Sequence, residues 1–233
     1  MHPQHPPTSE AEWLKQRLAE AASYAVLRRI APVLQHNVAG FMQPVSMLTT
    51  ILQRRVQMAQ PDMQLIAQNL ASISAQAKEA TSHCMSTVGW MVPSSDTPVS
   101  LRSGVNEAGQ LLELEFSETA LQLINDISDG NAVVSQSFLR NLVMGTLLAF
   151  CDQRSAGNTL QVTLEAGTGR GGATDRLLLR MLPGDRFKSP ASTDTDRKPR
   201  PIDWPDVKAV ADAFNVTMER GEGWLMLGLP KPG

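Results

Sequence analysis

Apolar residues recur every three or four positions through the first third of the chain. One such series runs from Leu27 to Val56 and a second from Met63 to Met91. This spacing lays a single apolar stripe along an α-helix. The pattern therefore predicts two helices that pack against each other as an antiparallel hairpin.

The starts of both helices carry recognisable signals. Ser9 and Glu12 have the spacing of a capping box, so the first helix is expected to begin there, after a proline-rich loose tail over residues 1–8. Pro61 followed by Asp62 predicts a proline in the first turn of the second helix and an acid that suits the helix dipole. Residues 9–92 are therefore expected to form one helical domain.

Two prolines interrupt the first helix. Pro32 and Pro44 each lack an N–H and clash with the preceding turn. We therefore expect a kink or a local break at either position, and a break would divide the helix into two pieces.

A lone hairpin of this kind leaves much apolar surface in water. Two hairpins from two copies bury the remaining stripe in a four-helix bundle. The chain is therefore expected to be a homodimer.

The character of the sequence changes after the second helix. Residues 93–99 hold two prolines and small polar residues, which predicts a linker, and residues 100–233 are expected to form a second domain. Helices and strands mix there without strict alternation, which favours an α+β sandwich with helices on one face of a sheet. The expected helices are near Leu101–Glu115, Ser135–Asp152 and Trp204–Phe214, and the strands near Leu121–Ile127, Leu160–Leu164, Leu177–Leu182, Val216–Glu219 and Trp224–Leu229.

Composition narrows the classes of function. The 233 residues carry a net charge of −2, which disfavours nucleic acid as the main partner. Cys84 and Cys151 are far apart and lack CxxC spacing, so neither a disulfide framework nor a cysteine-based zinc site is expected. No run approaches the roughly 20 apolar residues of a membrane-spanning helix. We expect a cytoplasmic protein without membrane attachment.

His36 is the histidine that the helical pattern singles out. It lies two residues from both Leu34 and Val38, which turns its ring away from the stripe and into water. A lone histidine in such a place is most often a solvated polar residue. Yet the segment HNVAGFMQPV, from His36 to Val45, resembles the phosphoacceptor box of sensor histidine kinases in the histidine, the apolar positions after it, and Pro44.

The second domain resembles the ATPase-like domain of those kinases in the order and length of its elements, but it departs from their nucleotide motifs. Of two asparagines expected four residues apart, Asn141 is present while Gly145 stands where the magnesium ligand would be. No Asp-x-Gly-x-Gly segment follows the strand that ends at Leu182, and the glycine-rich phosphate cradle before the last helix is replaced by Ile202-Asp203-Trp204-Pro205. The resemblance therefore implies neither ATP binding nor any other cofactor or metal in this chain.

These matches and losses together resemble the ChpT-type histidine phosphotransferases, which keep the kinase architecture with a degenerate ATPase-like domain. The resemblance implies that His36 carries a phosphoryl group between the aspartates of response-regulator receiver domains, with magnesium supplied by the receiver. The residues expected to dock the receiver lie on the same helix face: Arg29, Val33, Gly40, Gln43 and Met47.

The main alternative is a non-catalytic pseudokinase dimer that binds and regulates a receiver or a kinase, with His36 incidental. An active kinase would need the missing nucleotide motifs. In the family, the acid directly after the histidine assists kinase chemistry and a polar residue four positions after it orients water. Asn37 and Gly40 occupy those places, so neither activity is supported.

Other candidates have simpler explanations. The glycines of residues 167–172 predict a hairpin turn, and Lys188–Pro201 predicts a mobile loop. Cys84 is expected as a small buried hydrophobe and Cys151 as an undistinguished cysteine at a helix end. His83 has no metal-ligand spacing around it and is expected to be a solvated or satisfied histidine.

Overall fold

The computed structural model describes residues 9–91, 97–128, 132–153, 158–165, 175–183 and 200–229. The chain divides into two compact units: residues 31–93 form one, and residues 1–30 together with 94–233 form the other. The predicted tail, most of the predicted linker, the turn at residues 167–172 and nearly all of the loop at residues 188–201 lie outside the described residues.

The first unit is a helical hairpin. It contains the greater part of α1 (Glu10–Val56) and all of α2 (Met63–Met91). The predicted break in α1 is wrong, because the helix continues through both Pro32 and Pro44. The capping signal is confirmed in part, since the Ser9 hydroxyl accepts a hydrogen bond from the Glu12 N–H.

The start of α2 differs from the prediction by two residues. Asp62 is the capping residue, and its carboxylate accepts hydrogen bonds from the N–H groups of Gln64 and Leu65 at 3.0 and 3.1 Å. Pro61 therefore lies before the helix rather than in its first turn, because the carboxylate satisfies the first free backbone donors only from the cap position.

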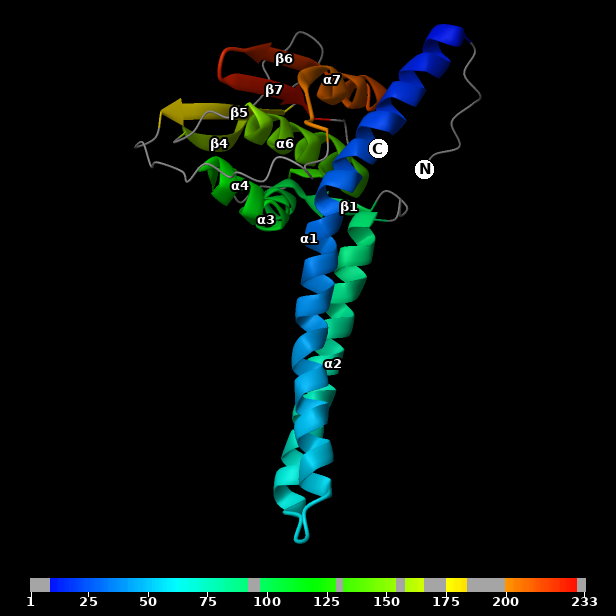
Figure 1. Cartoon of the computed structure of the whole chain (residues 1–233). Coiled ribbons are helices and arrows are strands. Elements are labelled where there is room, and N and C mark those ends of the chain that lie inside the picture. The colour runs from blue at the N-terminus through cyan, green and yellow to red at the C-terminus, as the bar shows by residue number, and fades with distance from the viewer. Residues whose placement is uncertain are drawn as a thin grey trace. The chain divides into compact units, whose positions relative to one another are not determined.

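The second unit is helix-rich with a mixed sheet, as expected for an α+β domain (Figure 1). Its helical elements are α3 (Leu101–Leu111), α4 (Glu113–Thr119), α5 (Gln136–Phe138), the π-helical stretch η1 (Leu139–Val143), α6 (Met144–Asp152) and α7 (Trp204–Ala213). Its strands are β1 (Pro98–Ser100), β2 (Gln122–Asn125), β3 (Val133–Ser135), β4 (Asn158–Glu165), β5 (Arg176–Pro183), β6 (Met218–Gly221) and β7 (Trp224–Gly228).

The main sheet has the strand order β2-β4-β5-β7-β6, with β2 parallel to β4 and the other pairs antiparallel. Alternate residues in the middle of the three inner strands are fully buried, which makes one face of the sheet the core surface. These residues are Leu160, Val162, Leu177, Leu179, Leu225 and Leu227, all with 0% exposure. The opposite face carries the exposed Arg180.

Three local features escaped the sequence prediction. The predicted helix from Leu101 is divided at Leu112 into α3 and α4. Pro98 and Val99, expected in the linker, belong to β1, which pairs with the unpredicted β3 in a small antiparallel sheet. Strands of three residues are too short to show an alternating pattern, so only the pairing partner reveals them.

The domain boundary also differs from the expected one. Residues 10–30 of α1 belong to the α+β unit, whereas the sequence assigns residues 9–92 to the hairpin domain. Helical periodicity records only that one face of a helix is buried, and it does not record which neighbour buries it.

Candidate functional site

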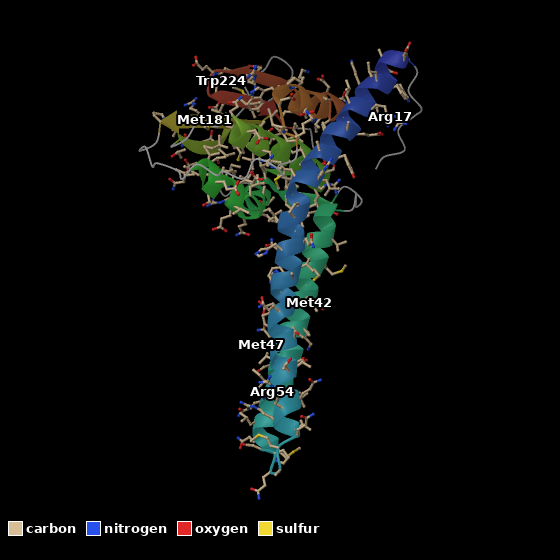
Figure 2. All side chains as sticks on the ribbon, viewed as in Figure 1. Arg17, Met42, Met47, Arg54, Met181 and Trp224 are labelled. Atoms are coloured by element: carbon tan, nitrogen blue, oxygen red, sulfur yellow. The ribbon has the colours of Figure 1, made fainter. Side chains whose placement is uncertain are left out.

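The candidate site is a stripe along the hairpin part of α1, centred on His36. His36, Gly40 and Gln43 are exposed, Met47 is 59% exposed (Figure 2), and Val33 is half-buried. At 3.6 residues per turn these five positions fall within about 80° of helix arc. The stripe combines an accessible imidazole with small, amide and thioether side chains.

Gly40 leaves open space one turn after His36. A Cβ atom built on Gly40 would meet no atom within 4 Å. Pro44 lies inside the helix and has no N–H to donate to the Gly40 carbonyl, so that oxygen is available to an external donor. A partner can therefore approach the backbone closely beside His36.

Arg29 does not belong to this stripe, contrary to the expectation from sequence. Its side chain is 5% exposed and pairs with Glu115 on α4 and Asp152 on α6. The hydrogen bonds that Arg29 donates to Glu115 raise the pKa of Arg29 against the opposing effect of burial. Arg29 therefore has a packing role in the α+β unit and is removed from the docking set.

His83 makes an aromatic contact within the hairpin. Its ring stacks on Phe41, with 4.0 Å between ring centroids and 10° between ring planes. Its Nε2 also lies 3.9 Å from a carboxylate oxygen of Glu79. Among the described residues there is no group of three or more metal-ligating side chains.

Two positions that the sequence analysis compares with nucleotide motifs, Gly145 and the start of α7, have contacts within this chain. Gly145 is buried, and a Cβ there would lie 3.2 Å from Val26 Cγ2. At the start of α7, Asp203 and Asp206 form a reciprocal capping box. Each carboxylate accepts a hydrogen bond from the other residue's N–H, so these two N–H groups already have acidic partners.

The two cysteines have different surroundings. Cys84 is expected to be buried, and the structure shows it half-buried. Cys151 is 1% exposed, and burial, followed by the charges of Glu115 and Asp152, raises its pKa to about 12. Its thiol is therefore protonated at neutral pH and a poor nucleophile.

Comparison with known proteins gives similarity at the level of structure alone. No protein-family model and no curated protein matches the chain. The Acinetobacter baumannii histidine kinase AdeS is 14% identical, with a TM-score of 0.40, over 80% of this chain and 96% of that one. Histidine kinase ThkA in complex with the response regulator TrrA is 13% identical, with a TM-score of 0.41, over 98% and 68%. A bacterial phosphotransferase is 10% identical, with a TM-score of 0.36, over 87% and 94%.

Identities and TM-scores this low carry no argument about residues or activity. Function is therefore argued from the side chains of this chain.

None of the helices within the described residues combines the length and the hydropathy of a membrane-spanning segment.

Proposed function

We propose that this chain is a histidine phosphotransferase of a two-component phosphorelay, with His36 as the phosphoryl carrier. The observation that carries the proposal is the exposed imidazole of His36 beside the open space at Gly40. A receiver domain brings an activated phosphoryl donor and its own magnesium ion. It requires of this chain only an accessible nucleophile and a surface on which to dock.

The transfer step involves one bond made and one broken. A ring nitrogen of neutral His36 donates its lone pair to the phosphorus of a receiver phospho-aspartate, forming a P–N bond as the acyl P–O bond breaks. The aspartate leaves as a carboxylate, and the reverse step passes the group to another receiver. Imidazole suits this exchange because it can be neutral near physiological pH.

Direct phosphorylation from ATP is not part of this proposal. Gly145 offers no side-chain oxygen for a metal ion, and Val26 lies against it. The carboxylates of Asp203 and Asp206 at the start of α7 would repel phosphates. These observations support phosphotransfer without kinase activity.

The proposed assembly is a homodimer formed by the hairpins. Large apolar side chains of both hairpin helices remain exposed in the single chain, as expected for a hairpin that lacks its partner. On α2 these are Met63, Leu70, Met85 and Val88, with exposures of 69%, 52%, 67% and 44%. Pairing with a second hairpin would remove this surface from water.

The alternative is a pseudokinase that binds a receiver or a kinase without accepting phosphate. Incubation with phosphorylated receivers distinguishes the two, with acid-labile label on this chain as the readout. His36→Gln should abolish the label while receiver binding persists, whereas the matched His83→Gln protein should still be labelled. If the wild type binds a phosphorylated receiver and never takes up label, or if His36→Gln is still labelled, the pseudokinase alternative replaces phosphotransfer.

A further inference from the structure

The first turns of α1, about six in number, cover part of the α+β unit. We call residues 10–30 the strap, and they belong to the same compact unit as α3 to α7. One face of the strap is buried: the small side chains Ala19, Ala22 and Val26 are 7%, 1% and 2% exposed, and the larger Ile30 at its end is 0% exposed. Small residues allow the backbone of the strap to lie close to the part of the α+β unit that it covers.

The strap approaches α6 closely at Val26. The 3.2 Å separation between Val26 Cγ2 and a Cβ placed on Gly145 is tighter than ordinary van der Waals contact. Glycine at position 145 therefore has a packing reason, independent of any lost metal ligand: it makes room for Val26.

A single charged residue holds the end of the strap. The Arg29 Nε and Nη2 atoms donate to the two oxygens of Glu115 at 2.8 and 2.7 Å, and Nη2 also donates to Asp152 Oδ1 at 3.1 Å. The other Asp152 oxygen accepts from the Ile202 N–H before α7. Arg29 thus ties the strap to α4, α6 and the segment that leads into α7.

The outer face of the strap is turned to water. Trp13 is 50% exposed, Leu18 52% and Tyr24 69%. The strap is therefore bound along a narrow inner face with its strongest polar contacts at one end. An element with few buried apolar contacts is one that opens at lower free energy than the whole fold.

We propose that the strap is a conformational device that opens as a unit while the rest of the α+β unit stays folded, with Arg29 as its latch. Opening would bare the α6 surface around Gly145 and the buried thiol of Cys151, which lies beside the Arg29 cluster. This proposal does not depend on the phosphotransfer function.

Cys151 supplies the test in the full-length chain. A Cys84→Ser background leaves Cys151 as the single thiol, and its reaction with excess Ellman's reagent reports exposure. In this background, labelling at low urea should depend only weakly on urea, because a small opening exposes little surface. Arg29→Met should label at least about tenfold faster, because it leaves two carboxylates without their cation. Arg28→Met removes the same charge from the exposed neighbouring residue and should label as slowly as the background protein.

A second pair of variants tests the packing of the strap against α6 without changing any charge. Gly145→Ala should accelerate Cys151 labelling by pushing Val26 away, and Val26→Ala in the same chain should restore slow labelling. The proposal is overturned if labelling in the background and in every variant rises with urea as steeply as global unfolding. It is also overturned if Arg28→Met accelerates labelling as much as Arg29→Met.

Discussion

The imidazole of His83 lies flat against the ring of Phe41, with 4.0 Å between ring centroids and 10° between ring planes. The stack joins α2 to α1 within the hairpin unit, five residues beyond His36 on α1. The two exposed histidines of the hairpin therefore have different roles: one packs against an aromatic ring, and the other is presented to solvent.

Replacing His83 should destabilise the hairpin. His83→Ala removes the stacked ring, and we expect a loss of about 1 kcal/mol in the free energy of unfolding. His36→Ala is the matched control, since its side chain is exposed, and it should leave stability nearly unchanged. Urea unfolding followed by circular dichroism measures both, and equal stabilities for the two variants would contradict a structural role for the stack.

The face around His36 should tolerate a bulky residue without unfolding but lose phosphotransfer. Gly40→Trp places a large ring in open space next to the imidazole and should block the approach of a receiver. Arg54→Trp is the control on the same helix, about 27 Å from His36 at 1.5 Å per residue, and should transfer normally. Transfer assays with a phosphorylated receiver measure the labelling of both variants. Normal labelling of Gly40→Trp would show that the receiver does not dock at this face.

The exposed apolar stripe of α2 should be the dimer interface. Leu70→Asp puts a charge where the proposed partner hairpin packs, and we expect it to convert the dimer to a monomer at micromolar concentration. Gln68→Asp adds the same charge at an exposed polar position on another face of α2 and should leave the dimer intact. Light scattering gives the mass of each protein, and a monomeric wild type would refute the four-helix bundle.

ATP with magnesium should show no measurable binding to this chain. Gly145 has no side-chain oxygen to offer a metal ion, and the start of α7 is capped by its own carboxylates. Isothermal titration calorimetry and incubation with γ-labelled ATP test this directly. Micromolar affinity, or label on the purified protein, would restore an active kinase as the better hypothesis.

Asp206 should make stability depend on acidic pH. Burial acts to raise the pKa of Asp206, but hydrogen bonds from Arg200 and Asp203 outweigh it, so its pKa lies below the ordinary 3.8. A carboxyl group with a lowered folded-state pKa stabilises the fold above its unfolded-state pKa. That contribution is lost as pH falls through the folded-state value.

The matching measurement compares the wild type with Asp206→Asn by urea unfolding across the pH range. The difference in unfolding free energy should be largest at neutral pH and shrink as pH falls below 3.8. A difference that stays constant across this range would show that the carboxylate charge contributes nothing.

The sequence by itself determined the helical hairpin, the mixed character of the second unit and the exposure of His36. These follow from local regularities, since a three-and-four spacing marks one buried face of a helix and a residue on the opposite side of that face must meet water. The strands β4, β5 and β7 were likewise visible as short apolar runs, and the structure places them within a few residues of the predicted bounds.

Only the tertiary structure decided the role of Arg29 and the place where α1 changes partners. A buried arginine looks like a surface arginine in sequence, because its two carboxylates lie 86 and 123 residues away. The same holds for Gly145, whose packing reason is a methyl group on a distant helix. Helix periodicity shows that one face of a helix is buried. It does not show which residues bury that face, because those residues lie far away in sequence and meet the helix only when the chain folds.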